Sequence, residues 1–244
     1  MTDSQHIVSS YDRDLEGVQA LIVKMGGLVE TAILDCAKAL ELRDEDLAEK
    51  VRQGDKAIDA MMEQINEETA TVIARRAPAA SDLRVVLSVM KMSNNLERIG
   101  DYAKNIAKRA GVLLQMTPIE GSSGAVRRMA REVELMLKDA LDAYIQRDPE
   151  LAQVVINRDK EVDQMYNALF REFLTFMMED PRNITACMHL HFIAKNIERM
   201  GDHVTALAEQ VIYVSTGKYP EEDRPKADST PYEVHGDPMA NNDD

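Results

Sequence analysis

The sequence predicts an all-α protein built as a tandem duplication of a three-helix antiparallel bundle. Of its 244 residues 45% are hydrophobic, but only 5% are aromatic and none is Trp. Aliphatic side chains and 15 Met must therefore form the core, and Gly and Pro are few, as is typical of helices packed on helices. Long stretches of helical period and a repeated set of motifs favour the same class.

Three helices are expected in each half of the chain, because apolar residues recur with helical period over six long stretches. The polar segment 1–11 is expected to be a flexible lead-in. Pro78 ends the second helix, and Pro181 ends the fifth in the same way. The six stretches cover about residues 12–42, 46–76, 81–113, 125–147, 149–179 and 183–216.

The third and sixth helices each carry a continuous apolar seam. Apolar residues from Val85 to Leu113 alternate at spacings of four and three, and the same alternation recurs from Ala186 to Val214. This pattern keeps one stripe of a helix against its neighbours, as in helical bundles. We therefore expect both helices to pack through these seams.

The two halves match in sequence as well as in period. The segment from Arg43 to Asp59 recurs 104 residues later, and the pentapeptide at residues 97–101 recurs after 101 residues. A fixed offset across helices and turns indicates a duplicated unit. The turn-rich stretch between them separates two repeats, which we place at residues 12–116 and 122–216. The polar, acidic segment 217–244 lacks a helical period and is expected to be a disordered tail.

The charge of the chain argues against direct binding to nucleic acid. The formal net charge is −14, whereas a phosphate backbone requires a basic surface. A cation or a basic partner suits this surface better. The chain begins without an apolar leader, and no stretch approaches the ~18 apolar residues of a membrane span. We expect a soluble, cytoplasmic protein that reaches a membrane only through its partners.

Paired carboxylates are the main candidates for a functional site. The pentapeptides Glu-Arg-Ile-Gly-Asp and Glu-Arg-Met-Gly-Asp each place two acids four residues apart, about one helical turn. These acids lie more than about 100° from the seam of their own helix, so they are expected to face outward. The preceding helix offers an Asp pair at the same spacing, which an antiparallel bundle could bring close. The candidates are Glu97, Asp101, Glu198, Asp202, Asp55, Asp59, Asp159 and Asp163.

Two interpretations of these acids remain open. A solvated acidic face, with surface ion pairs worth about 0–1 kcal/mol each, is the ordinary one. Metal binding is favoured by the duplication of the motif, by the second Asp pair in each half, and by Gly100 and Gly201, which would expose backbone to an approaching group. An all-oxygen ligand set suits magnesium, manganese or iron.

No catalytic motif is present, so an enzyme is not expected. The segment Gly121-Ser-Ser-Gly lacks the Lys of a phosphate-binding loop, and Cys36 and Cys187 lie too far apart in sequence for a typical ligand pair. His203 follows Asp202, but Tyr102 takes the equivalent place in the first half. This histidine is therefore not part of the candidate site that the two halves share. The Glu-x-x-His signature of di-iron bundles is absent.

The motifs resemble those of the PhoU family of bacterial phosphate-signalling regulators. The resemblance rests on LERIGDYAKNIAKRA at 96–110, IERMGDHVTALAEQV at 197–211, the DK(A/E)(I/V)D segments at 55–59 and 159–163, and MGGLVETAI at 25–33. It covers about residues 6–217 and leaves the tail outside.

The resemblance implies an all-α, often homodimeric protein that is not an enzyme. Proteins of this family restrain the phosphate-starvation (Pho) response by relaying the state of the phosphate ABC transporter to the sensor kinase PhoR. Contacts with the transporter ATPase PstB and a limit on phosphate uptake are also implied. The E(D)xxxD motifs of the family bind multinuclear metal clusters, in some members iron or zinc, and these motifs fall on the eight carboxylates named above.

Two other functions stay open at this point. One is a carboxylate-bridged metal protein, either a metal store or a metal-dependent enzyme. The other is a histidine-phosphotransfer module, for which His203 would have to be exposed on the bundle.

Overall fold

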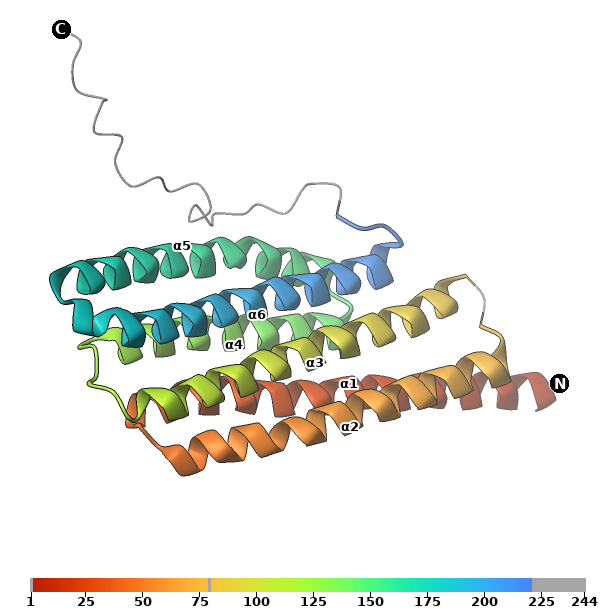
Figure 1. The fold of residues 1–244 in the computed structure, drawn as a ribbon. Coiled ribbons are helices and arrows are strands. Elements are labelled where there is room, and N and C mark those ends of the chain that lie inside the picture. The colour runs from red at the N-terminus through yellow and green to blue at the C-terminus, as the bar shows by residue number, and fades with distance from the viewer. Residues whose placement is uncertain (1, 79, 221–244) are drawn as a thin grey trace, which may run out of the picture.

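The computed structural model describes residues 2–78 and 80–220, with side chains from Arg13 onward. Within these ranges the protein contains six long α-helices and no strand (Figure 1). A short 3₁₀ turn, Pro181–Asn183, precedes the last helix. The all-α class and the six helices are confirmed. The helices are α1 (Thr2–Leu42), α2 (Glu45–Arg76), α3 (Ser81–Leu113), α4 (Ser122–Gln146), α5 (Pro149–Glu179) and α6 (Ile184–Thr216).

The first helix begins earlier than the sequence predicted. It is helical from Thr2, so the predicted start at about residue 12 is wrong, while the flexibility expected of the lead-in stays a prediction. This segment contains neither Gly nor Pro. Since each residue added to an existing helix contributes one backbone hydrogen bond, the helix can extend through a segment that lacks an apolar period.

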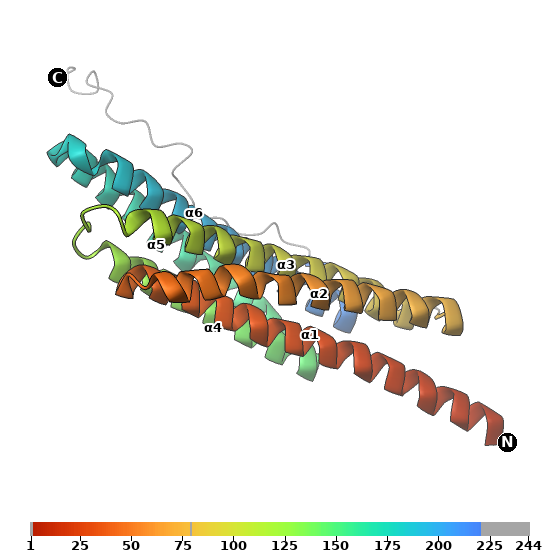
Figure 2. The same ribbon diagram turned by 60° about the horizontal axis from the view of Figure 1, so that its bottom comes forward.

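The helices form two layers that are shared by the two repeats. α2, α3, α6 and α5 lie side by side in this order, and α1 and α4 pack together behind them (Figures 1 and 2). The repeats join where α3 packs on α6 and α1 packs on α4. The buried apolar side chains of both repeats form one continuous core. None of the described helices has both the length and the apolar character that a membrane crossing requires.

The predicted seams contribute to this core. From Val89 to Leu113 every seam residue of α3 is buried, and in α6 the same holds from Ala186 to Val211. α1 packs closely on α4 at Gly26, where an added Cβ would overlap Cδ1 of Leu141. The glycine therefore permits a close contact between the two helices.

The duplication is visible in the turns as well as in the helices. Arg43 and Arg147, which are 104 residues apart, both adopt φ 54°. The residue after each is an N-cap: the carboxylate of Asp44 accepts a hydrogen bond from the amide of Leu47, and Asp148 caps α5 in the same way. The turns α1–α2 and α4–α5 are thus two copies of one structure.

The end of α6 is held against the first repeat. The ring of Tyr219 stacks on Tyr213 with centroids 4.3 Å apart, and Lys91 of α3 donates a hydrogen bond of 2.8 Å to the Tyr219 hydroxyl. Residues 217–220, which were expected to belong to a disordered tail, are therefore placed by contacts with α3 and α6. Residues 221–244 lie outside the described residues.

Candidate functional site

The first carboxylate set, Asp55, Asp59, Glu97 and Asp101, comes together where α2 packs on α3. Asp55 is buried with 3% of its side chain exposed, whereas Glu97 and Asp101 remain 18% and 35% exposed. The two helices therefore bring both acidic pairs into one neighbourhood, as the antiparallel arrangement predicted. The set lies at the edge of the helix–helix contact and is only partly open to solvent.

Lysine and arginine side chains already occupy part of this neighbourhood. The ammonium of Lys104 donates a hydrogen bond to Asp55 across the α2–α3 contact and lies 3.7 Å from Asp101 on its own helix. Arg98 lies 3.6 Å from Glu97 and 3.7 Å from Asp101. Because Arg98 is 60% exposed, its pairs are the weaker ones.

Burial, and after it the crowding of like charges, shifts the pKa values of this set. Burial raises the pKa of Glu97, and the nearby charge of Asp101 raises it further. Burial also raises the pKa of Asp59, followed by the charge of Asp55. The pKa of Lys104 is raised, chiefly by its hydrogen bond to Asp55. Folding thus makes Glu97 and Asp59 easier to protonate and Lys104 harder to deprotonate than in an exposed side chain.

The second carboxylate set, Asp159, Asp163, Glu198 and Asp202, lies where α5 packs on α6. Asp159, Asp163 and Glu198 are buried, with 2%, 3% and 5% of each residue exposed. The prediction that Glu198 faces outward is therefore wrong, because α6 packs on α3, α4 and α5 and buries side chains outside its own seam. The ammonium of Lys195 lies 2.9 Å from Glu198.

The glycines of both motifs face the neighbouring helix. An added Cβ at Gly100 would lie 2.9 Å from Cδ1 of Ile58, and one at Gly201 would lie 2.9 Å from a carboxylate oxygen of Asp159. The sequence suggested that these glycines expose backbone to a ligand. In the structure they are buried and let α2 approach α3, and α5 approach α6.

The donor set suits a hard cation, but the side chains are not placed to hold one. Ammonium groups lie on Asp55 and Glu198, one in each set. Among the described residues, no group of three or more His, Cys, Asp or Glu side chains is arranged to hold a metal ion. The carboxylates as placed therefore do not fit a resident metal cluster, and metal binding here stays a prediction that requires side chains to move.

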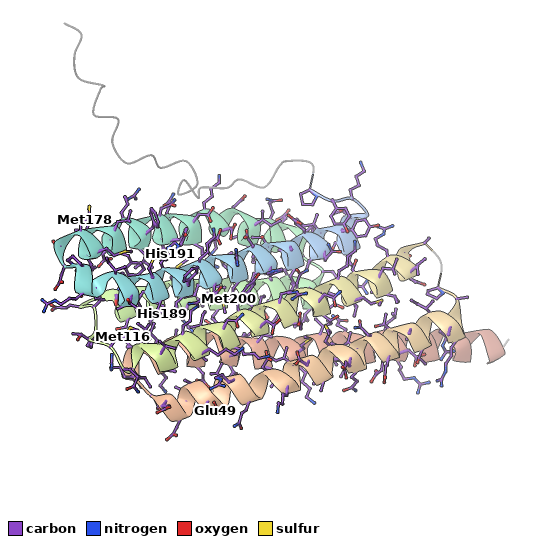
Figure 3. The ribbon with its side chains drawn as sticks, viewed as in Figure 1. Glu49, Met116, Met178, His189, His191 and Met200 are labelled. Atoms are coloured by element: carbon purple, nitrogen blue, oxygen red, sulfur yellow. The ribbon has the colours of Figure 1, made fainter. Side chains whose placement is uncertain are left out.

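His189, His191 and His203, whose side chains the structure describes, lie in helix contacts and outside both carboxylate sets. The ring of His203 is 5.7 Å from that of Tyr102, and its Nδ1 lies 2.9 Å from Oδ1 of Asn95, so it sits between α6 and α3. His189 and His191 lie in the first part of α6 (Figure 3). Burial lowers the pKa of both imidazoles.

Sequence reasoning assigned no role to the two lysines that pair with the carboxylate sets. Lys104 lies three residues after Asp101, and Lys195 lies three residues before Glu198, and side chains at that spacing share one face of a helix. This spacing was the available signal. The contact of Lys104 with Asp55 could not be read from it, because that contact joins two helices.

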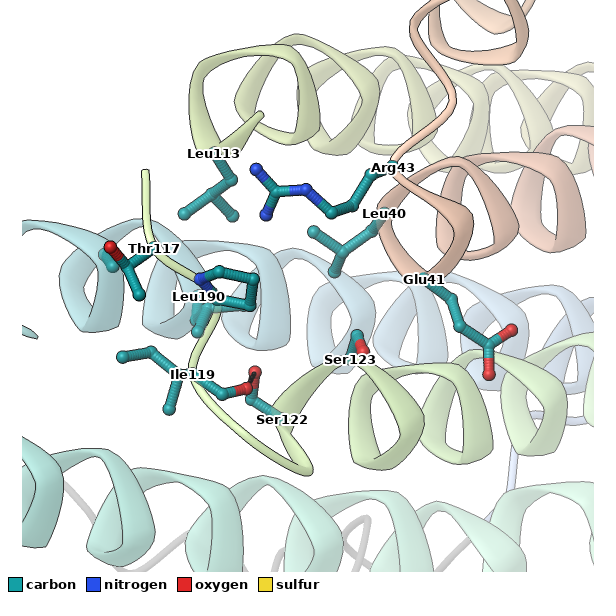
Figure 4. Close-up of a pocket in the computed structure, with 11 residues that line it drawn as sticks. Leu40, Glu41, Arg43, Leu113, Thr117, Ile119, Ser122, Ser123 and Leu190 are labelled. Carbon is teal, nitrogen blue, oxygen red and sulfur yellow. Dashed lines mark hydrogen bonds between the residues drawn. The ribbon is translucent and has the colours of Figure 1, made fainter. Parts of the chain in front are cut away.

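A small apolar cavity of about 90 Å³ lies where the repeats connect (Figure 4). Leu40, Leu113 and Leu190 line it, together with the turn that precedes α4. Two of its polar side chains bond to the backbone of the turn: Arg43 donates to the carbonyl oxygen of Leu114 at 2.6 Å, and Ser122 donates to the carbonyl oxygen of Ile119. The cavity shows no chemistry of its own.

Comparison with known proteins identifies the fold and its repeats. The family model described as the PhoU domain matches residues 22–110 and 126–211, once in each repeat. The chain belongs to the PhoU family. The resemblance that the motifs suggested is thereby confirmed, and the two matched segments fall within α1–α3 and α4–α6.

Relatives in this family match the chain over nearly its whole length. The "Phosphate-specific transport system accessory protein PhoU homolog" of Caulobacter vibrioides strain NA1000 is 44% identical, over 92% of this chain and 98% of the relative. The protein of the same name from Rhizobium meliloti strain 1021 is also 44% identical, over 92% and 95%. That from Zymomonas mobilis is 46% identical, over 91% and 93%.

Two crystal structures of PhoU proteins share the fold. PhoU from Pseudomonas aeruginosa is 40% identical and superposes with a TM-score of 0.82, over 85% of this chain and all of that one. The phosphate transport system regulatory protein PhoU from Streptococcus pneumoniae is 28% identical and has a TM-score of 0.79, over 87% of this chain and all of that one. The two-layer arrangement is thus a family fold.

Proposed function

We propose that this chain is a non-enzymatic accessory protein that regulates phosphate transport. The observation that carries the proposal is the match to relatives named as accessory proteins of a phosphate-specific transport system, which extends over 98% of the Caulobacter protein. Both repeats match the PhoU domain, and the fold is that of a protein titled a phosphate transport system regulatory protein. The match therefore concerns the whole relative rather than a shared module.

The finer proposal concerns how this regulation works. The chain acts as a negative regulator of the phosphate-starvation (Pho) regulon in the cytoplasm, where it relays the state of the phosphate ABC transporter to the sensor kinase PhoR. It contacts the ATPase subunit PstB as well as PhoR, limits phosphate uptake, and works as a homodimer. A protein with this task acts through the surfaces that it presents to its partners.

Deletion of the gene tests the regulatory proposal directly. An alkaline phosphatase reporter under phosphate-starvation control should become active in high phosphate, and the wild-type gene supplied on a plasmid should silence it again. A reporter that stays silent after the deletion would contradict the proposal. Cross-linking in cells, with PstB and PhoR followed by antibody, tests the two contacts separately from the reporter.

Metal binding by the eight carboxylates is a separate proposal that applies only to a state in which Lys104 and Lys195 have left Asp55 and Glu198, and no step of the regulation above depends on it. Iron, zinc, manganese or magnesium would place positive charge among the acids and would have to displace the lysines that lie on Asp55 and Glu198. Metal analysis of purified wild-type, Asp101→Ala and Asp202→Ala proteins tests it. Equal metal content in all three would contradict the assignment.

The histidine-phosphotransfer alternative gains no support from the placement of His203. A phosphotransfer histidine must reach the active site of a partner, whereas this ring lies against Tyr102 and Asn95 between two helices. The metal-store alternative likewise lacks a group of side chains arranged for a metal among the described residues.

A further inference from the structure

The contact between Lys104 and Asp55 joins two helices at a buried carboxylate. Asp55 is 3% exposed, and its oxygen accepts a hydrogen bond from an ammonium that comes from α3. The same ammonium lies 3.7 Å from Asp101. A buried carboxylate is costly unless a cation or several donors compensate its charge. Lys104 supplies that compensation from within the chain.

An ammonium in this position acts against a metal ion in two ways. It occupies oxygens that a divalent cation would need as ligands, because such a cation must draw several carboxylate oxygens to within ~2.6 Å. It also carries a positive charge only a few ångströms from the place that a metal ion would occupy. Repulsion between the two positive charges is strong there, because the site is partly shielded from water. A metal ion can enter the set only if the ammonium leaves.

The second repeat offers an internal comparison for this position. The residue of the second repeat that is equivalent to Lys104 is Thr205, which lies 101 positions later in the sequence and is buried. Its hydroxyl donates a hydrogen bond of 2.8 Å to the backbone carbonyl of Asp202, within its own helix. In the second set the ammonium of Lys195 reaches Glu198 along α6. The two sets share their motif acids but differ in the residue one turn beyond them.

We propose that Lys104 is the resident cation of the first carboxylate set, and that it excludes divalent metal ions from this set. In the first repeat the ammonium of Lys104 thereby compensates the negative charge of the two acidic pairs. Thr205 brings no such charge to the equivalent position of the second repeat. The proposal concerns only these side chains, so it stands or falls independently of the role in phosphate transport.

Binding of Mn²⁺ to the full chain tests the proposal. Free Mn²⁺ gives an electron paramagnetic resonance signal that is lost on binding, so a titration of metal-stripped protein counts sites and their affinities. The key variants are Lys104→Thr, which installs the residue of the second repeat, and Lys104→Gln, which keeps a hydrogen-bond donor but removes the charge. Lys108→Thr is the matched control, because this exposed lysine lies one turn later on the same helix.

We expect each Lys104 variant to bind one further Mn²⁺ per chain, or to bind it about tenfold more tightly than the wild type. Asp55→Asn in the Lys104→Thr background should remove the gain, which locates the new site in the first set. The Lys108→Thr protein should titrate like the wild type. Millimolar Mn²⁺ should also raise the melting temperature of the Lys104 variants more than that of the wild type.

Two results would overturn the proposal. In one, both Lys104 variants, shown to be folded by circular dichroism, bind Mn²⁺ with the stoichiometry and affinity of the wild type. In the other, Lys108→Thr gains as much binding as Lys104→Thr, which would mean that net charge alone sets the affinity. The glutamine variant keeps the test decisive if the threonine variant does not fold.

Discussion

Tyr102 and His203 occupy equivalent positions of the two repeats, and their rings lie 5.7 Å apart. Equivalent residues contact each other where two copies of a unit are related by a two-fold axis. The contact therefore places a local pseudo-two-fold axis between α3 and α6. The carboxylate motifs, one residue before each ring, lie on either side of it.

Substitution of His203 should separate packing from phosphotransfer. His203→Phe keeps a ring against Tyr102, so we expect it to repress the alkaline phosphatase reporter as the wild type does. His203→Ala removes the ring and should lower the free energy of unfolding by about 1–2 kcal/mol, measured by urea denaturation. If the phenylalanine variant is stable but cannot repress the reporter, the histidine has a chemical role that the proposed mechanism lacks.

Asp55 and Lys104 should be coupled in stability. Removal of either partner leaves the other charge without its hydrogen bond, and we expect a loss of about 1–3 kcal/mol for Asp55→Asn. The value is smaller than for a fully buried pair, because Lys104 is 31% exposed and can be hydrated. A double-mutant cycle with Lys104→Met, followed by urea unfolding in the absence of metal, measures the coupling. Losses that add within ~0.5 kcal/mol would show that the pair contributes no coupling.

Two neighbouring glycines should respond to alanine in opposite ways. At Gly26 the added Cβ meets Leu141 of α4, so we expect Gly26→Ala to destabilise the protein by about 1–3 kcal/mol. At Gly27, which is exposed and has no atom near the added Cβ, alanine should stabilise α1 by about 0.5–1 kcal/mol. Thermal unfolding of both variants checks the pair, and the same sign for both would contradict the close contact between α1 and α4.

Neutralising Glu97 should stabilise the protein in a manner that depends on pH. Its pKa is raised in the folded state above the ordinary value of 4.5, so ionised Glu97 opposes folding at neutral pH and its protonation favours folding. Glu97→Gln should therefore gain about 0.3–0.5 kcal/mol at pH 7, the usual size of a like-charge pair on a helix. The gain should vanish below pH 4.5, where Glu97 is protonated in both states.

The control for this titration is Glu67→Gln, an exposed glutamate two turns beyond Asp59 on α2. Urea unfolding between pH 4 and 8, with a chelator present, gives the difference between each variant and the wild type. A gain for Glu97→Gln that stays constant across this range, or an equal gain for Glu67→Gln, would show that the burial of Glu97 and its neighbouring charges are not its cause.

Helical period and internal repetition were enough to predict the helices and their duplication. The seam from Val89 to Leu113 is buried as predicted, because the period of an apolar stripe reports directly on a helix and its core. The angular position of Glu198 relative to the apolar seam of α6 could not predict that its side chain is buried. α6 packs on α3, α4 and α5, and a helix covered on three sides buries more of its surface than one stripe.

Contacts between distant parts of the chain account for the other differences. The pairing of Lys104 with Asp55 and the stacking of Tyr219 on Tyr213 depend on the positions of side chains in space. Gly100 was interpreted as an opening for a ligand, although in the structure Ile58 fills that space. The sequence shows where a glycine permits another group to lie close to the backbone, but only the packed structure shows which group lies there.

The pseudo-two-fold axis at the contact of Tyr102 with His203 resembles the two-fold axis of a homodimer. The two differ in how the residues on either side of the axis can change during evolution. In a homodimer one gene encodes both sides of the axis, so every substitution appears twice and the two sides stay identical. Here each side is encoded by its own part of the gene, so the two sides can differ. Tyr102 faces His203, and Lys104 and Thr205 occupy equivalent positions. Fusion of the copies in one chain thus allows each side to specialise while the shared core holds them in register.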